Sequence, residues 1–242
     1  GRHFVSGHGN GAVIAWEIET GRIVFDTLHP RTITSIAITP DGHRVVVGSY
    51  DGNIRILDFE TGRPVGVFQG HSAFVRSLVL TRDGRFAISA SNDRTVKVWD
   101  LEMANVDQNR VIAERHTAAI NSVALSPDGQ FAVTGSSDST VKLWQLSSGR
   151  VVHTQGSHSG SVNTVAITPD GQLGVSGSND CLIRIWALET GKLVNELKAR
   201  FRVVDVAITP DGRRAISASG SGILAEWDMV TGAEQYAFDA KV

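Results

Sequence analysis

The sequence predicts an all-β fold made of repeated antiparallel sheets, and three observations carry this prediction. A Thr/Ser-x-Asp-Gly tetrapeptide recurs with its glycines 41 to 45 residues apart, at Gly42, Gly84, Gly129, Gly171 and Gly212. A large apolar residue recurs in step with it, at Trp16, Leu57, Trp99, Trp144, Trp186 and Trp227. Within each repeat the apolar residues alternate with a period of two, which is typical of strands rather than helices.

The second repeat illustrates the elements in order. Residues 33–39 read as a strand that ends at a Pro-Asp-Gly turn, and residues 44–49 read as the strand that follows. Residues 53–59 predict a third strand, closed by Glu-Thr-Gly, and residues 64–68 predict a fourth. Four short antiparallel strands in a repeat of this length are typical of a β-propeller blade.

We therefore expect one propeller domain spanning residues 1–242. The expected blades are approximately 1–28, 29–70, 71–115, 116–157, 158–198 and 199–242. Residues 1–6 align with the second strand of a blade, so the first blade lacks its inner strand. We expect the chain to be a fragment of a longer one, with an intact ring of either six or seven blades.

Composition excludes several classes of protein. The 23 basic and 25 acidic residues leave a net charge of −2, whereas nucleic-acid and anionic-membrane binders need a basic field. No apolar run is long enough to predict a membrane-spanning segment. The single cysteine, Cys181, excludes an internal disulfide framework and favours a reducing, cytoplasmic location.

The repeats resemble the WD40 family along essentially the whole chain. The resemblance rests on Gly70-His71 before a first strand, Ser89 in the second strand, Asp93 in the next turn and Trp99-Asp100 at the end of the third. It implies a structural hydrogen-bonded tetrad of His, Ser/Thr, Asp and Trp in each blade. Three complete tetrads follow by position: His71, Ser89, Asp93 and Trp99; His116, Thr134, Asp138 and Trp144; His158, Ser176, Asp180 and Trp186.

Other repeats depart from this pattern. The second keeps His29 and Asp51, but has Val47 and Leu57 at the other two positions. The sixth lacks both the His and the Asp. Its Asp205 stands where other repeats have Ser or Thr, and we expect Arg202 or Arg200 to pair with this carboxylate.

Catalysis is not expected. A nucleophile needs one specially activated copy, whereas the Ser, His and Asp residues recur at fixed spacing. The remaining histidines lack convergent partners for a metal, and the glycine-rich stretches align with turns rather than with nucleotide-binding motifs. We therefore expect no catalytic residues, no metal and no cofactor.

Basic residues also recur two positions before four of the six Trp-equivalent positions. They could form a ring that binds phosphate, but one basic residue per blade instead favours a strand face with a packed stem and a solvated head. These residues are Arg55, Lys97, Lys142 and Arg184.

Functional residues are expected where the repeats differ. In WD40 proteins partners commonly bind the top face, near the central channel, and Tyr, Trp and Arg dominate binding hot spots. The candidate partner-binding residues by position are Thr32, Thr34, Tyr50, Phe74, Arg76, Asn92, Asn121, Asn163, Asn179 and Arg202.

The resemblance implies a non-catalytic scaffold that binds protein or peptide partners. One alternative is a structural adaptor, or an autoregulatory or sensor domain, in a larger multidomain protein. Repeats such as residues 207–219 resemble those in large signalling NTPases with WD40 propellers, so other domains of the parent chain are candidate partners. A propeller enzyme or small-ligand binder is a third class, for which the sequence offers no clustered constellation.

Overall fold

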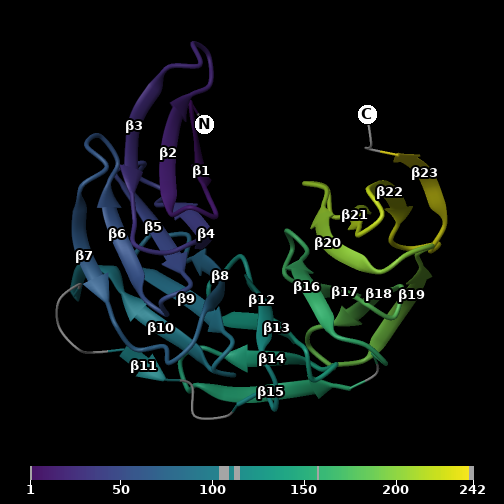
Figure 1. The fold of residues 1–242 in the computed structure, drawn as a ribbon. Helices are drawn as coiled ribbons and strands as arrows, with labels where there is room; N and C mark the ends of the chain where they lie inside the picture. Colours follow the sequence, from purple (N-terminus) through teal and green to yellow (C-terminus); the bar gives the residue numbers. More distant parts are fainter. Residues whose placement is uncertain (1, 104–108, 112–114, 157, 240–242) are drawn as a thin grey trace. The chain divides into compact units, whose positions relative to one another are not determined.

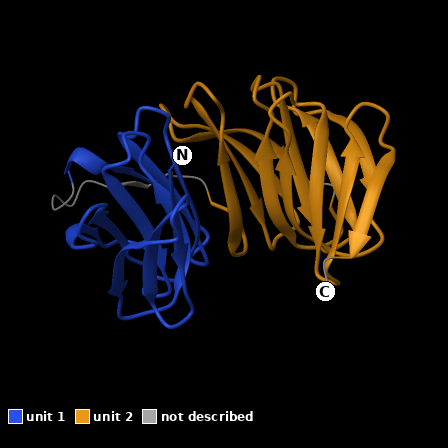
Figure 2. Ribbon diagram, turned by 90° about the horizontal axis from the view of Figure 1, so that it is seen from above, with its two compact units in different colours: residues 1–112 blue, residues 113–242 orange. Residues whose placement is uncertain are grey.

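A computed structural model describes residues 2–103, 109–111, 115–156 and 158–239. They form antiparallel sheets connected by short turns, and their only helix is a short 3₁₀ turn at Leu101–Met103. The all-β prediction is confirmed. The chain divides into two compact units, residues 1–112 and 113–242, which Figure 2 distinguishes by colour.

The first unit contains one three-stranded and two four-stranded sheets (Figure 1). The three-stranded sheet is β1 (His3–Gly7), β2 (Ala12–Glu17) and β3 (Ile23–Leu28). The next is β4 (Ile33–Ile38), β5 (Arg44–Ser49), β6 (Ile54–Asp58) and β7 (Pro64–Phe68). The third is β8 (Val75–Leu80), β9 (Phe86–Ser91), β10 (Val96–Asp100) and β11 (Asn109–Val111).

The second unit contains three four-stranded sheets. They are β12 (Ile120–Leu125), β13 (Phe131–Ser136), β14 (Val141–Gln145) and β15 (Arg150–Gln155); β16 (Val162–Ile167), β17 (Leu173–Ser178), β18 (Leu182–Ala187) and β19 (Leu193–Lys198); and β20 (Val203–Ile208), β21 (Arg214–Ser219), β22 (Ile223–Asp228) and β23 (Glu234–Asp239). Each sheet follows the chain order strand by strand, as expected for blades.

The Thr/Ser-x-Asp-Gly tetrapeptides form the turns between first and second strands. In the second repeat, Asp41 Oδ1 accepts hydrogen bonds from the Thr39 hydroxyl (2.6 Å) and the His43 amide (2.9 Å). Gly42 follows at a φ of 77°, which glycine adopts more readily than other residues. We call the end of each sheet with these turns the bottom end, and the opposite end the top end.

The core lies between neighbouring sheets within each unit. The second strands β5, β9, β13 and β17 are each buried along five consecutive residues. Burial on both faces suits a run of small and β-branched residues better than alternation with polar ones.

Small residues in the second strands let the next sheet approach closely. A Cβ built on Gly48 would lie only 2.6 Å from Cγ1 of Val75, which belongs to the first strand of the following sheet. Gly135 faces Val162 and Gly177 faces Val203 in the same way. Because a methyl group at these sites cannot fit without displacing the valine, glycine sets the separation of the sheets.

Asp205 also joins neighbouring sheets, but not as expected. Its Oδ1 accepts hydrogen bonds from the hydroxyl of Thr164 on β16 and from the amide of Val206, each at 2.9 Å. Arg200 pairs with Glu234 at 3.0 Å, and no ion pair reaches Asp205 from the described residues. The expected ion pair was wrong, because a hydroxyl and an amide already supply the donors that the carboxylate needs.

Replacing Gly48 with alanine should destabilise the chain by roughly 1–3 kcal/mol, because the added methyl group overpacks against Val75. Urea unfolding should show partial rescue in the Gly48→Ala/Val75→Ala double variant. The control is Gly9→Ala, because a Cβ at Gly9 has nothing within 4 Å. Equal stability of the Gly48 and Gly9 variants would contradict the close-approach argument.

Candidate functional site

A buried hydrogen-bonded network joins the elements of the third blade. His71 Nδ1 lies 2.8 Å from Asp93 Oδ2, and its Nε2 lies 2.7 Å from the hydroxyl oxygen of Ser89. The indole N–H of Trp99 donates to the same hydroxyl at 2.8 Å. Since the carboxylate can only accept, His71 donates from Nδ1 and accepts the Ser89 proton at Nε2. The network therefore links the loop before β8, strands β9 and β10, and the turn between them.

The Asp93 carboxylate is held ionised. Burial opposes ionisation, but hydrogen bonds from His71 and from the hydroxyl and amide of Thr95 outweigh it and hold the pKa of Asp93 far below its usual range. The His71 side chain is fully enclosed, with 0% exposure. The arrangement is therefore a charged but fully hydrogen-bonded structural group.

The same network recurs twice in the second unit. His116 contacts Asp138 (2.9 Å) and Thr134 (2.8 Å), and Trp144 donates to Thr134 (2.7 Å). His158 contacts Asp180 (2.9 Å) and Ser176 (2.8 Å), and Trp186 donates to Ser176 (2.9 Å). Burial lowers the pKa of both histidines, despite the adjacent carboxylates, which act in the opposite sense. All twelve side chains assigned to tetrads from the sequence thus lie in three such networks.

In the repeats with incomplete tetrads, the remaining polar side chains have other hydrogen-bond partners or none. In the second blade the buried Nε2 of His29 has no hydrogen-bond partner, because Val47 stands where Ser or Thr stands in the complete tetrads. Asp51 instead binds the Arg55 guanidinium and the Ser49 hydroxyl. In the sixth blade only the bond from Trp227 to Ser217 remains, at 2.8 Å.

The recurring basic residues act within the blades. Arg55 pairs with Asp51, and Arg184 bridges Asp180 (3.4 Å) and Glu196 (2.8 Å). Lys97 donates to the Gly70 carbonyl, and Lys142 donates to Thr154 at 3.0 Å. Lys97 and Arg184 are buried, so the expectation of solvated head groups was wrong for these two, whereas the contact of Lys142 with Thr154 is exposed. The sequence showed the recurrence but not these partners, which lie on adjacent strands for Lys142 and for the Glu196 contact of Arg184, and in turns or loops otherwise.

The top end of the first unit presents an exposed aromatic pair. The rings of Tyr50 and Phe74 stack with centroids 4.2 Å apart and planes 5° apart. Tyr50 is 41% exposed and Phe74 is 38% exposed. Tyr50 lies in the turn after β5 and Phe74 lies just before β8, so the pair joins two blades. Such a pair is an apolar surface whose geometry is already formed.

Polar residues surround this pair. Arg76 is exposed and donates from Nε to Asn92 Oδ1 at 2.7 Å. The Thr32 hydroxyl donates to the Gly9 carbonyl, and the Thr34 hydroxyl donates to the Val75 carbonyl. Among the six candidates of this unit, Tyr50, Phe74 and Arg76 are exposed and Asn92 is half-buried. The two threonines connect neighbouring blades.

Two candidates of the second unit, Asn121 and Asn163, connect neighbouring blades through hydrogen bonds. Asn121 donates from Nδ2 to the Val162 carbonyl (2.8 Å), and Asn163 donates to the Val203 carbonyl (2.7 Å), in each case on the next blade. Asn163 also donates to the side chain of Asn179 at 2.8 Å. Arg202 is exposed beside Gly220, where a Cβ would collide with its guanidinium.

Within the described part of the chain, no group of three or more His, Cys, Asp or Glu side chains could hold a metal ion. The Ser, His and Asp side chains that come together do so in buried networks with their atoms already hydrogen-bonded. No helix among the described residues is long and apolar enough to cross a membrane.

Comparison with known proteins decides the family. The family model "WD domain, G-beta repeat" matches residues 24–58, 62–100, 109–145 and 149–187, which is more than half of the chain. The chain belongs to the WD40 family. The three complete tetrads lie within or next to these matched repeats, so the buried networks described above are features of WD40 blades in this chain.

The chain is similar to parts of longer proteins, including WD repeat-containing proteins. WD repeat-containing protein 37 of Mus musculus is 33% identical over 42% of this chain, and autophagy-related protein 16 of Arabidopsis thaliana is 29% identical over 41%. The THO complex subunit 6 homolog of Danio rerio is 30% identical over 38% of this chain. The matches cover only 21%, 19% and 32% of these three proteins.

Removal of the shared hydroxyl should destabilise a complete tetrad more than an incomplete one. Ser89→Ala leaves both His71 Nε2 and Trp99 Nε1 without a partner and should lower the free energy of unfolding by ~3 kcal/mol. Ser217→Ala orphans only Trp227 Nε1 and should lower it by ~1–2 kcal/mol. Chemical denaturation measures both, and equal losses would contradict the shared-acceptor role.

Stability should fall in two stages on acidification. His116 and His158 have pKa values below the ordinary 6.5, and Asp93 and Asp138 have values below the ordinary 3.8, so each group binds more protons after unfolding. The free energy of unfolding should therefore decrease below about pH 6.5 as the unfolded histidines protonate. The free energy of unfolding should decrease again below about pH 3.8, where the carboxyl groups of the unfolded chain become protonated.

Urea titrations between neutral and acidic pH measure this profile. His116→Gln should reduce the first stage and leave the contribution of His158. A profile that stays level below pH 6.5 in the unsubstituted chain would contradict the assigned direction.

Proposed function

We propose that this WD40 chain is a non-catalytic platform that binds protein or peptide partners, chiefly at the top ends of its blades. The observation that supports this most is the exposed stack of Tyr50 on Phe74 at the same end of the blades as the exposed Arg76. Aromatic and Arg side chains dominate binding hot spots, since they combine a large contact area with directed donors. WD40 repeats are generally non-catalytic and commonly bind proteins, which agrees with this proposal.

The preformed geometry favours binding. The rings are already parallel at 4.2 Å, and Arg76 is already held by Asn92 at 2.7 Å, so a partner orders few side chains on arrival. The entropy lost on association is correspondingly small. A flat aromatic surface next to a guanidinium suits a peptide that carries an apolar side chain and a carboxylate or a backbone carbonyl.

The remaining candidates either contact a partner directly or hold the top-end loops in place. Arg202 and Asn179 are exposed and can contact a partner directly. Thr34, Asn121 and Asn163 each hold a backbone carbonyl of the next blade, so they act mainly by keeping the top-end loops in place. Thr32 and Asn92 orient their neighbours in the first unit.

The alternative is a structural adaptor, or an autoregulatory domain that contacts other parts of its own parent chain. It is supported by the small share of each relative that this chain matches, between 19% and 32%, and by the name of the relative that is a THO complex subunit. A signalling NTPase as parent and a cytoplasmic location belong to the same proposal, and both rest on the sequence pattern.

Loss of the exposed top-end group should abolish capture of the partner. Affinity purification with the chain and its Phe74→Ala/Arg76→Ala variant would identify proteins retained only by the former, and calorimetry would then measure binding. We expect at least about tenfold weaker binding for the variant. The control is Tyr236→Ala/Arg150→Ala, which removes an exposed aromatic and a basic residue from the outer strands β23 and β15.

Equal loss in both variants would show a general surface effect and would contradict the top-end site. Retention of the partner by both variants would place binding elsewhere. Thermal unfolding of each variant would establish that the substitutions leave the fold intact, because all four side chains are exposed.

A further inference from the structure

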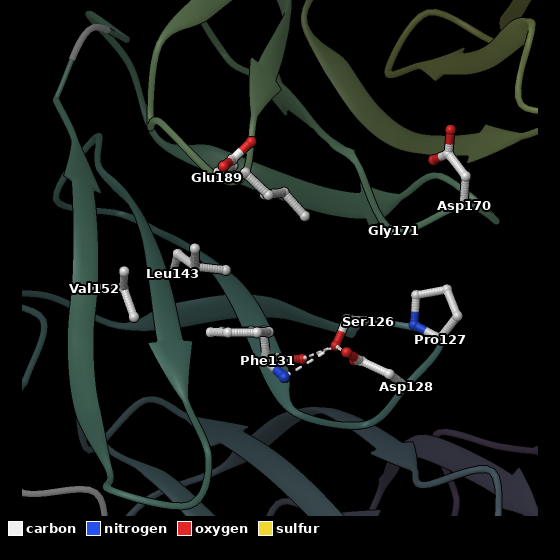
Figure 3. A pocket seen from close by; sticks show the side chains of 10 residues that line it. Ser126, Pro127, Asp128, Phe131, Leu143, Val152, Asp170, Gly171 and Glu189 are labelled. Carbon is white, nitrogen blue, oxygen red and sulfur yellow. Dashed lines mark hydrogen bonds between the residues drawn. The ribbon is translucent and has the colours of Figure 1, made fainter.

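A cavity of about 430 Å³ opens at the bottom end of the second unit, between the fourth and fifth blades (Figure 3). Its walls are apolar: Phe131, Leu143 and Val152 come from strands β13 to β15, and Leu188 follows β18 in the next sheet. Val152 is 44% exposed, whereas Leu143 and Leu188 are buried, so the cavity deepens from an accessible mouth to a closed floor. Its volume lies within the range of ligand pockets.

The rim of this cavity is acidic. Asp128, Asp170 and Glu189 line it from three bottom-end turns, and none of the lining residues is basic. Figure 3 shows Asp170 and Glu189 across the opening from Phe131, Leu143 and Val152. Three carboxylates around an apolar floor are complementary to a cation attached to an apolar group.

Some oxygen atoms of the rim carboxylates remain available to accept hydrogen bonds from a partner. Asp128 Oδ1 is used by the Ser126 hydroxyl and the Gln130 amide, and Asp170 Oδ1 by the corresponding Thr168 and Gln172 groups. These bonds lower the pKa of both aspartates, which are therefore ionised at neutral pH. Within the described residues, neither Oδ2 atom and neither oxygen of the Glu189 carboxylate forms a hydrogen bond or an ion pair.

Two contacts between neighbouring blades fix the positions of the cavity walls relative to each other. The His153 ring donates from Nε2 to the Glu189 carbonyl at 2.9 Å, and it packs against Gly191. At the other side Pro127 packs on Gly171, where an added Cβ would lie 3.2 Å from the proline ring. The cavity is therefore formed before any partner arrives, which reduces the ordering needed on binding.

The corresponding place in the first unit has a different chemistry. Arg44 stands at the position of Phe131, five residues after the turn Thr or Ser, and its guanidinium donates to the Leu101 carbonyl at 3.3 Å. The cavity there is smaller, about 300 Å³, and its titratable lining residues are His43, Arg44, Asp58 and Glu102. The turn aspartates recur in five repeats, but Phe131 in place of Arg44 leaves only acidic charges around an apolar floor among the described residues that line this cavity. This combination is a feature of the second unit.

We propose that this cavity, which we call the bottom pocket, binds a protein segment in which an apolar side chain is flanked by Lys or Arg. The apolar side chain contacts Phe131, Leu143 and Leu188, and the flanking cations lie against the rim carboxylates. The bottom pocket lies at the end of the blades opposite Asn121, Asn163 and Asn179. It is a second site, independent of the proposed top-end surface.

A tetrapeptide probe tests the proposal with the 242-residue chain. Acetyl-Arg-Leu-Leu-Arg-amide is titrated into protein labelled at Leu and Val methyl groups, and acetyl-Glu-Leu-Leu-Glu-amide is the charge-reversed control. We expect saturable shifts of the Leu143, Val152 and Leu188 signals with the basic peptide alone. Raising the salt concentration should weaken binding, because exposed charges are screened.

Two variants localise the interaction. Val152→Arg introduces a cation at the mouth and should weaken binding at least about tenfold, whereas Glu189→Gln should weaken it less and reduce the dependence on salt. The matched control is Val194→Arg, because Val194 occupies the equivalent bulge in β19 and is 55% exposed. All three substitutions are at accessible positions, so the fold should remain intact.

Several results would overturn the proposal. They are the absence of saturable shifts, equal response to the acidic peptide, or unchanged binding by Val152→Arg. Shifts of the same methyl signals on raising the protein concentration without peptide would instead identify a second copy of the chain as the occupant. The Phe74→Ala/Arg76→Ala variant should bind the probe normally, so failure at one site is distinguishable from failure at the other.

Discussion

The structure depends on keeping a buried carboxylate hydrogen-bonded. An unpaired Asp at the position of Asp93 would be strongly destabilising in the enclosed space between loop and sheet. The histidine supplies one donor, the following turn supplies others, and the hydroxyl of Ser89 completes the chain to Trp99. One network thereby sets the position of a top-end loop relative to the two central strands. The same constraint, repeated in three blades, makes the sheets rigid supports.

Because the buried networks stabilise the sheets, the residues of the loops can differ from one repeat to the next. The exposed side chains that could bind a partner lie in these variable loops. Glycines such as Gly48 and Gly177 set how closely successive sheets pack, and side chains such as Asn121 and Asn163 tie the top ends of neighbouring blades. Tyr50 and Phe74 are not needed for these ties and lie stacked on the surface. A scaffold whose stability comes from buried networks can carry exposed aromatic residues at its rim without depending on them.

The two proposed sites, at opposite ends of the blades, differ in their chemistry. The top end of the first unit combines aromatic faces with a guanidinium, which suits acidic or carbonyl-rich segments. The bottom pocket of the second unit combines an apolar floor with three carboxylates, which suits basic segments. With a net charge of only −2, this contrast comes from the local placement of charges and not from a general bias of the chain.

The sequence by itself determined the repeat and the strands, which follow from spacing, and its resemblance to the WD40 family implied the three complete tetrads by position. Asp93 and His71 are 22 residues apart, and the fixed length of the intervening hairpin is enough to bring them together. Only the tertiary structure decided what happens between blades and between strands. The partners of Asp205, the pairing of Arg184 with Glu196 and the tie from Asn163 to Val203 all depend on neighbours that spacing does not specify. The stack of Tyr50 on Phe74 and the bottom pocket likewise require two sheets packed side by side, so their geometry could not be read from either repeat alone.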